Sequence, residues 1–291
     1  MHPNQNGFAT FMKTLQQRVR NLFRRETPQQ PAPDHAEIDV FSWSPSSGHR
    51  NFGDHLARVL VTKILADHGH VIEESVPEPK RLLTIGSVVH FGRTGDVVWG
   101  SGVNGKATDD AHHRYADLDV RAVRGPLTRQ FLMQRGIAVP EIYGDPALLL
   151  PHVFPGRFRA DPRKRYAVVP NLHDLKNLQD EKVQHLVSPL DSWNNCVTQI
   201  LQAELVVSSS LHGIVIAEAY GIPARYVRYT ETEKPFKYND YMMGTGRGEM
   251  EAAKSIEEAL EMGGMPGPRF DPKPLLDAFP IDIWRGRKED A

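Results

Sequence analysis

Residues 205–223 read Leu-Val-Val-Ser-Ser-Ser-Leu-His-Gly-Ile-Val-Ile-Ala-Glu-Ala-Tyr-Gly-Ile-Pro, and this stretch decides the fold class. An apolar run suited to a buried parallel strand is followed by three serines and then by a helical pattern that ends at Gly221 and Pro223. Ligands of open α/β sheets bind beyond the carboxyl ends of the strands, where helix N-termini carry a partial positive charge. We therefore expect His212, which lies at the turn, to contact a ligand; the alternative is that it only caps the helix.

Three more segments of the chain carry recognisable motifs. Residues 51–54 read Asn-Phe-Gly-Asp, residues 120–132 carry arginines around a Gly-Pro turn, and residues 143–151 contain a Gly-Asp-Pro turn. With the Ser-Leu-His of the turn, this ordered set resembles the polysaccharide pyruvyl transferase family, over roughly residues 38–245. A further segment, Lys-Tyr-Asn-Asp-Tyr-Met-Met at residues 237–243, is similar to the branch that acts in bacterial exopolysaccharide synthesis.

The resemblance implies an α/β fold of two Rossmann-like domains that face a cleft, similar to the glycosyltransferase-B arrangement. It also implies an enzyme that transfers the pyruvyl group of phosphoenolpyruvate to two hydroxyls of a sugar in a lipid-linked exopolysaccharide repeat unit, forming a cyclic ketal. No cofactor is implied beyond this donor substrate. Two alternatives stay open: a nucleotide-sugar glycosyltransferase, and a non-catalytic carbohydrate-binding protein that would use Trp193, Tyr238 and Tyr241.

Strand-like and helix-like segments alternate from residue 37 onward, which is typical of an α/β protein. Apolar runs predict strands at 38–43, 82–85, 88–91, 97–99, 120–123, 166–169, 205–207 and 224–227. Apolar periodicity predicts helices at 54–68, 125–135, 192–203, 213–220 and 251–262. The predicted parts are an N-terminal segment 1–36, α/β domains 37–152 and 153–270, and a C-terminal segment 271–291 that packs on the first domain.

Composition excludes several classes of function. Of the 291 residues 40% are hydrophobic and 24% are charged, and no apolar run approaches the roughly 20 residues of a membrane span. A net charge of −1 argues against a nucleic-acid partner. The single cysteine, Cys196, permits no internal disulfide, fits a reducing, cytoplasmic location and is expected to pack in a helix.

Residues 1–26 are the compositional exception. Apolar residues recur there at three- and four-residue steps, and five lysines and arginines precede the first acidic residue. Two interpretations stay open for this basic amphipathic helix. It could lie on the anionic inner face of the cytoplasmic membrane, or it could pack on its own domain or on a partner. Residues 27–36 are rich in Pro and Gln and predict a flexible linker.

Two residues are expected to do the chemistry. A histidine has an ordinary pKa near neutrality, so His212 suits protonation of the donor's methylene carbon. Asp54 is expected to accept a hydroxyl proton, although it could simply be the N-cap of the helix that follows. The donor's carboxylate and phosphate need cations and N–H groups, which we expect from Arg124, Ser209, Ser210, Leu211 and Gly213. Many family members carry an arginine at position 210, and this chain has a serine.

Acceptor contacts or cleft positions are expected at Asn51, Gly53, Asn104, Asp145, Lys237 and Tyr241. The Gly-x-Gly-x-x-Gly match at 100–105 falls late in its domain, so we interpret it as a glycine loop that lines the cleft and not as a dinucleotide site. Adjacent His112 and His113 are expected on the surface. The sequence contains no motif that predicts a metal site.

Overall fold

A computed structural model describes residues 38–44, 50–70, 80–230 and 233–284. The first half contains a four-stranded parallel sheet in the order β1-β2-β3-β4, whose strands are β1 (Ile38–Phe41), β2 (Lys80–Leu83), β3 (Val97–Trp99) and β4 (Asp119–Ala122). Its helices are α2 (Phe52–Asp67) and α3 (Pro126–Met133), with the 3-10 helices η1 (Val89–Phe91) and η2 (Asp110–His112). The strands are short and mostly buried, as parallel strands covered on both faces are.

The second half contains another four-stranded parallel sheet, in the order β5-β6-β7-β8. Its strands are β5 (Ala167–Val169), β6 (Val206–Ser208), β7 (Ala224–Val227) and β8 (Ala252–Ala253). The accompanying helices are α5 (Leu172–Asp180), α6 (Trp193–Leu201), α7 (Leu211–Ala219), α8 (Phe236–Gly244) and α9 (Ile256–Met262). Between the two sheets the chain forms η3 (Pro146–Leu149) and α4 (Leu150–Val153), and it continues after α9 with α10 (Pro272–Asp277) and η4 (Ile281–Trp284).

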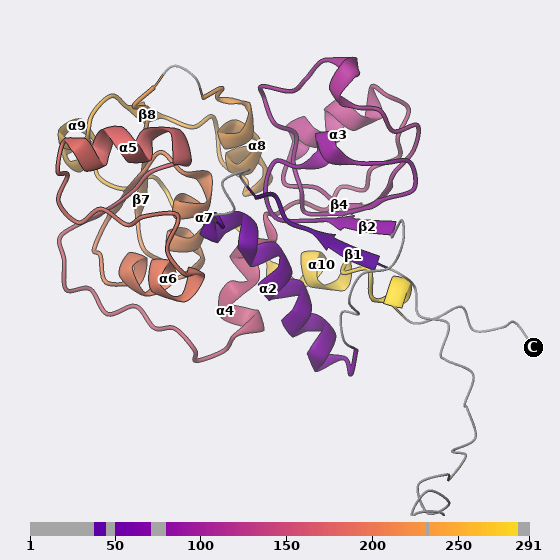
Figure 1. Cartoon of the computed structure of the whole chain (residues 1–291), viewed down its shortest axis with the longest axis horizontal. Coiled ribbons are helices and arrows are strands. Elements are labelled where there is room, and N and C mark those ends of the chain that lie inside the picture. The colour runs from indigo at the N-terminus through magenta and orange to yellow at the C-terminus, as the bar shows by residue number, and fades with distance from the viewer. Residues whose placement is uncertain (1–37, 45–49, 71–79, 231–232, 285–291) are drawn as a thin grey trace, which may run out of the picture. The chain divides into compact units, whose positions relative to one another are not determined.

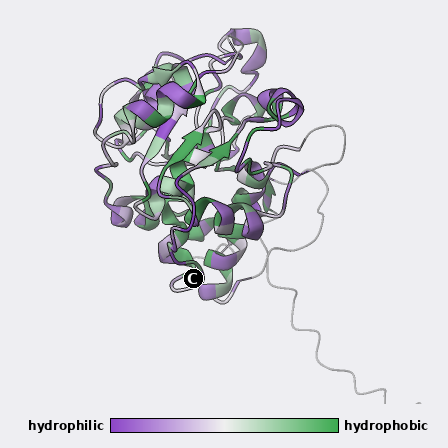
Figure 2. Ribbon diagram, turned by 90° about the vertical axis from the view of Figure 1, so that its left-hand side faces the viewer, coloured by the Kyte–Doolittle hydropathy of each residue, from purple (hydrophilic) through white to green (hydrophobic). Residues whose placement is uncertain are grey.

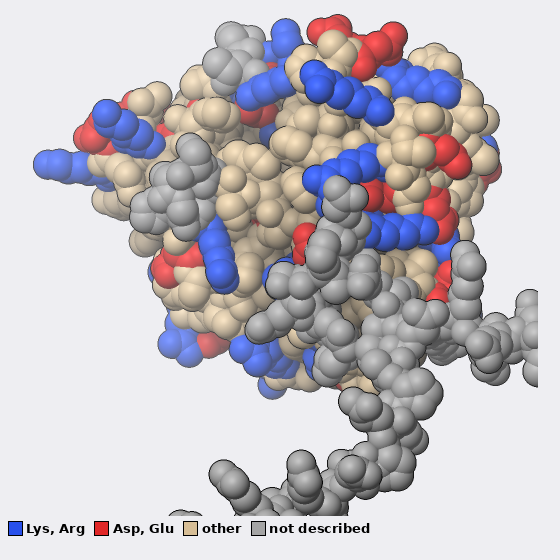
Figure 3. All heavy atoms as spheres, turned by 45° about the vertical axis from the view of Figure 1, so that its right-hand side comes forward, with Lys and Arg blue, Asp and Glu red and all other residues tan. Residues whose placement is uncertain are grey.

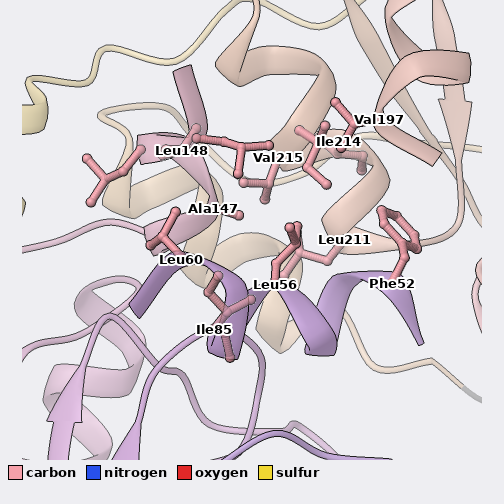
Figure 4. Packing of buried hydrophobic residues seen from close by; sticks show 14 of the residues in the cluster. Phe52, Leu56, Leu60, Ile85, Ala147, Leu148, Val197, Leu211, Ile214 and Val215 are labelled. Carbon is pink, nitrogen blue, oxygen red and sulfur yellow. The ribbon is translucent and has the colours of Figure 1, made fainter. Parts of the chain in front are cut away.

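Helix α2 joins the two sheets through the core. Leu56 and Leu60 point from α2 toward Leu211, Ile214 and Val215 of α7, and one hydrophobic cluster contains strand residues of both sheets (Figures 1 and 4). Helix α7 is apolar on nearly every side, so it is buried all round instead of on one stripe. Residues 37–284 accordingly form one compact unit. The division into domains at residue 152 stays a prediction.

The segment after α9 returns to the first sheet. The Trp99 indole N–H donates to the carbonyl of Leu275 at 2.8 Å, and its ring meets Phe279 edge-on at 5.0 Å between centroids. Phe279 in turn stacks on Trp284. On the surface, Arg121 of β4 pairs with Asp282 at 2.8 Å. The last described residues therefore belong to the core of the first sheet.

The mixed α/β class and the two parallel sheets agree with the sequence prediction, whereas several details differ. The helix predicted at 251–262 is shorter, because Ala252–Ala253 forms β8 and α9 begins at Ile256. Residues 88–91 are mostly a 3-10 helix and not a strand, because an apolar run of that length does not distinguish the two. Helix α2 begins at Phe52 and its N-cap is Asn51, so Asp54 lies in the first turn. His113 is buried and bonded through both ring nitrogens, whereas His112 is exposed as expected.

The distribution of apolar and charged residues is that of a core covered by a polar surface. Apolar residues gather on the central strands and polar ones on the outer loops and helices (Figure 2). Acidic and basic side chains are interspersed on the face shown in Figure 3. Within the described ranges, no helix combines the length and apolarity needed to cross a membrane. The predicted membrane-surface helix at residues 1–26 lies outside those ranges.

Candidate functional site

A cavity of about 280 Å³ lies where the loops after the strands of both sheets meet. Its lining comes from the loops that follow β1, β2, β3, β5 and β7, from the turn between β6 and α7, and from the start of α8. All these positions follow the carboxyl ends of parallel strands or begin a helix, which is where ligands of α/β proteins bind. The sequence-based expectation that His212 lies at such an edge agrees with this placement.

His212 and Asp54 lie together in the cavity wall. Gly53 makes this possible, because a Cβ there would lie 2.1 Å from Nδ1 of His212. Gly86 also approaches both side chains. It has a φ of +104°, and a Cβ on it would lie 3.1 Å from Oδ1 of Asp54 and 4.0 Å from Cε1 of His212. Nε2 of His212 is buried and has no hydrogen-bond partner among the described residues. A buried ring nitrogen of this kind is a candidate ligand contact.

The protein shifts these two groups in opposite directions. Burial raises the pKa of Asp54 to about 7, with Lys237 opposing this effect and Asp145 adding to it. Burial lowers the pKa of His212 to about 3, and the nearby charges of Lys237 and Arg124 lower it further. The expectation of a near-neutral pKa is therefore wrong for His212 and applies to Asp54. At neutral pH the imidazole is uncharged and Asp54 exchanges a proton readily.

Two lysines supply positive charge to the cavity. Nζ of Lys106 and Nζ of Lys237 each lie 2.5 Å from a different carboxylate oxygen of Glu233, and all three residues line the cavity. Lys106 belongs to the loop after β3 and Lys237 to α8, so Glu233 links the two halves of the structure. Burial lowers the pKa of Lys237, and the charge of Glu233 opposes that effect. Lys237 thus reaches the cavity as expected.

Arg124 lies behind the cavity wall. Its side chain is fully buried and pairs with Asp240 of α8, with Nη2 3.0 Å from Oδ2. Its Nε donates to Oδ2 of Asp240 at 3.1 Å, its Nη1 to the Ser87 hydroxyl at 2.7 Å, and its Nη2 also to the carbonyl of Val103 at 3.0 Å. The expected bidentate contact with an anion would need these donors, so this arrangement corrects that expectation. Arg124 holds Ser87, which does line the cavity.

The serine-rich turn bonds mostly to itself and to its neighbours. Ser208 Oγ accepts from the backbone N–H of Ser210 at 3.0 Å and lies 2.7 Å from the carbonyl of Val169. Ser209 accepts from the backbone N–H of Asn171. Of the three serines only Ser210 lines the cavity, followed by Leu211 and His212. A Cβ at Gly213 would lie 2.4 Å from Ser208 Oγ, so this glycine lets α7 approach β6.

The remaining predicted positions divide into two groups. Asn51 and Asn104 line the cavity. Gly53 lies beneath it, and Asp145 and Tyr241 are fully buried outside its lining. Tyr241 donates to Glu218 at 2.6 Å. Burial raises the pKa of Asp145 to about 6, and its Oδ2 has no partner in the part of the chain that the structure describes.

Eleven of the cavity residues were not singled out from the sequence as site residues, including Trp43, His90, Phe91, Lys106 and Glu233. Each of these five is a lone side chain in a loop or short helix, so no spacing rule selects it. The order of the strands could have indicated them, because each follows the carboxyl end of a strand that faces the cavity. Among the described residues, no three His, Cys, Asp or Glu side chains gather in a way that could hold a metal ion.

Comparisons with known proteins agree with the motifs. A family model described as polysaccharide pyruvyl transferase matches residues 51–231. The uncharacterized protein L143 of Acanthamoeba polyphaga mimivirus is 28% identical over 204 residues, which cover 66% of this chain and 70% of that protein. The succinoglycan biosynthesis protein ExoV of Rhizobium meliloti (strain 1021) is 28% identical over 213 residues, or 69% of this chain and 63% of ExoV.

Similarity extends to a solved structure. It is a functionally uncharacterized protein, KP1_0663, from Klebsiella pneumoniae subsp. pneumoniae NTUH-K2044. The TM-score is 0.45 at 9% sequence identity, over 76% of this chain and 94% of that one.

Proposed function

Because the chain belongs to the polysaccharide pyruvyl transferase family, as its ordered motifs predict, we propose that it transfers the pyruvyl group of phosphoenolpyruvate to a sugar. The acceptor would be a sugar of an exopolysaccharide repeat unit, in line with the name of the relative ExoV, and the product a cyclic pyruvate ketal. The observation that carries the proposal is the pairing of Asp54 and His212, with oppositely shifted pKa values, in a cavity that also holds two lysines.

The donor is an anion with a phosphate and a carboxylate, and the cavity offers complementary groups. Lys106 and Lys237 supply charge, and Ser210 and the N-terminus of α7 supply a hydroxyl and N–H groups. The lysines would thus take the place of the arginine that many family members carry at position 210. Arg124 acts as a positioning residue, because it holds the Ser87 hydroxyl through its pair with Asp240.

The opposite pKa shifts assign the proton transfers. Protonated Asp54 donates to the methylene carbon of phosphoenolpyruvate, which becomes a methyl group, and the central carbon gains oxocarbenium character. One sugar hydroxyl adds to that carbon and gives its proton to His212. Phosphate then leaves and takes the proton of His212, while a neighbouring hydroxyl closes the ketal and returns a proton to Asp54. Both residues end in their starting states.

This assignment exchanges the roles expected from the sequence, in which His212 was the acid. Binding of an anion near His212 stabilises the imidazolium, because it offsets the charges of Lys237 and Arg124 that lower the histidine pKa. The imidazole thereby becomes a better base when the donor is bound. Asp54 needs no such help, because its pKa of about 7 already keeps a substantial protonated fraction at neutral pH.

The arrangement of the two sheets is proposed to follow the glycosyltransferase-B pattern, with one Rossmann-like domain for each sheet. Support comes from the parallel order of both sheets and from the position of the cavity beyond their strands. The carbohydrate-binding alternative loses support, because Tyr238 and Tyr241 are fully buried. A nucleotide-sugar glycosyltransferase is the remaining alternative, since a shared fold does not fix the reaction.

Residues 1–26 are proposed to hold the protein at an anionic membrane surface, where lipid-linked acceptors would be found. Their five basic residues and apolar stripe support this, because each basic residue near an anionic surface adds about 1 kcal/mol. Sedimentation of the full-length protein and of a variant without residues 1–26 with phosphatidylglycerol vesicles tests it. Equal binding of the two proteins would contradict it.

The experiment that tests the function combines phosphoenolpyruvate or a nucleotide sugar with oligosaccharide acceptors and measures product mass and phosphate release. We expect a mass gain of one pyruvate ketal and release of one phosphate per transfer. Asp54→Asn and His212→Asn should each lower the rate by about 10² to 10⁴. His152→Asn, an exposed histidine of α4 outside the cavity, is the control. Transfer from the nucleotide sugar alone would contradict the proposal.

A further inference from the structure

Part of the cavity wall is aromatic. Trp43, which follows β1, and His90 and Phe91 of η1 line the same cavity as Asp54 and His212. The Phe91 side chain is 37% exposed, which is unusual for a large apolar side chain in the described part of this protein. An exposed aromatic face beside a candidate site of chemistry is a feature of ligand binding.

The aromatic wall is held rigidly from behind. Phe91 packs against Phe41 at 5.2 Å and against the His90 ring at 4.0 Å between centroids. Trp43 packs on the same hydrophobic cluster as Phe41, a cluster centred on strands β2, β3 and β4. Because side chains in such a cluster are fixed in position, the rings are available to a ligand without reorganisation.

His90 adds a polar atom to this wall. Its Nδ1 is buried and makes no hydrogen bond of normal distance and angle among the described residues. Burial lowers the pKa of the ring, and the backbone of Ser87 is close enough to oppose this larger effect. His113, whose ring lies 6.4 Å away between centroids, cannot serve as a partner for Nδ1. Its own nitrogens are occupied by the Tyr115 hydroxyl at 2.6 Å and the carbonyl of Ala107 at 2.8 Å. A buried polar atom left without a partner costs stability unless a ligand or water satisfies it.

A pyranose ring suits this combination. It presents a face of C–H groups, which packs on an aromatic ring, and an edge of hydroxyls, which needs a fixed hydrogen-bond partner. The donor has no such face, and its charges are matched by Lys106 and Lys237. We infer that Trp43 and Phe91 form a platform for the acceptor sugar and that Nδ1 of His90 bonds one of its hydroxyls. The inference rests on the proposed function for the class of acceptor.

The platform is tested by saturation-transfer NMR and calorimetry without donor, on the full chain. The probes are methyl glycosides of glucose, galactose, mannose and N-acetylglucosamine and the disaccharides lactose and cellobiose. We expect saturation to reach the ring C–H protons of at least one probe. Trp43→Leu and Phe91→Leu keep apolar packing but remove the flat ring, and each should raise the Kd of that probe about tenfold.

Two further variants separate recognition from folding. Phe91→Tyr keeps the ring and should bind like the wild type, and so should Leu190→Ala, which removes an exposed apolar side chain outside the cavity. His90→Ala should weaken binding, and His90→Asn should restore it, because the amide places a polar atom near the site of Nδ1. In the transfer assay the leucine variants should raise the KM of the acceptor and leave that of phosphoenolpyruvate unchanged.

Several results would overturn the inference. The inference is wrong if no probe shows saturation transfer. It is also wrong if the wild type and both leucine variants bind the sugar probe with equal affinity. Uridine diphosphate binding that disappears in Phe91→Leu would mean that the platform stacks a nucleobase instead. Glycan binding by the platform without phosphate release from phosphoenolpyruvate would sink only the proposed function. Transfer with an unchanged acceptor KM in both leucine variants would sink only the platform.

Discussion

The Cα of Gly53 faces the imidazole of His212 so closely that an added Cβ would lie 2.1 Å from Nδ1. Either the imidazole or the start of α2 must therefore move in Gly53→Ala. We expect a large loss of transferase activity and a loss of about 1–3 kcal/mol in unfolding free energy. Activity and urea denaturation should be measured together with Gly248→Ala, where an added Cβ meets nothing within 4 Å. Full activity of Gly53→Ala would show that the position of His212 is unimportant.

The stability of the protein should depend on pH through two opposing groups. The pKa of Asp54 is raised from 3.8 to about 7, so its contribution is present at low pH and is lost as pH rises toward 7. The pKa of His212 is lowered from 6.5 to about 3, so its contribution is present above pH 6.5 and is lost as pH falls toward 3. In the wild type, the contributions of Asp54 and His212 to the free energy of unfolding therefore change with pH in opposite directions.

Single variants should reveal the pH dependence that each group gives to the free energy of unfolding. The free energy of unfolding of Asp54→Asn, relative to the wild type, should increase between pH 4 and 7 by up to about 1.4 kcal/mol per pH unit. The free energy of unfolding of His212→Asn, relative to the wild type, should decrease between pH 3 and 6.5. Urea denaturation across this range measures both differences. Curves parallel to that of the wild type would contradict the pKa shifts.

Removing one partner of the buried ion pair between Arg124 and Asp240 should destabilise the protein strongly. Asp240→Asn leaves the guanidinium without a counter-charge, and we expect it to lower the unfolding free energy by about 3–5 kcal/mol. Asp161→Asn removes one partner of an exposed pair with Arg163 and should change it by less than about 1 kcal/mol. Similar small effects in the two variants, by thermal or urea unfolding, would argue that Arg124 is solvated.

Lys237 and Lys273 each form an ion pair with an acidic residue four positions away, but only Lys237 faces the cavity. Lys237→Gln should raise the KM of phosphoenolpyruvate by at least about tenfold, because it removes a positive charge that lies in the cavity and is largely buried. Lys273→Gln should leave the KM unchanged. Steady-state titration of the donor at saturating acceptor compares them. Equal KM values would remove Lys237 from the donor site.

Local patterns in the sequence predict the local parts of this fold. The turn before α7 was found because an apolar run, three serines and a helical pattern follow one another within 19 residues, and the structure places His212 at the cavity accordingly. Helix α8 was not predicted. Its buried Tyr238, Tyr241 and Met242 do lie on one helical face, but the helix has only nine residues and its other buried residue is the charged Asp240, so the apolar pattern is too short to stand out.

Long-range partners account for most of what the sequence could not predict about the site. Arg124 resembled a free anion-binding group because its partner Asp240 lies 116 positions later. The pKa exchange between Asp54 and His212 has the same origin, since burial by neighbours far along the chain sets both values. Trp43 and Phe91 gave no signal because a lone aromatic residue after a strand is common in hydrophobic cores.

The bond from Trp99 to Leu275 has a consequence for synthesis on the ribosome. These two residues are 176 positions apart, so at about 5–20 residues per second a nascent chain exposes the ring of Trp99 for roughly 10–35 s before its partner is made. For most of that interval, after β4 has also been translated, the first sheet has all four of its strands but lacks the cover that Phe279 and Trp284 provide. A ribosome stalled before residue 275 should therefore carry a chain that recruits chaperones at β3.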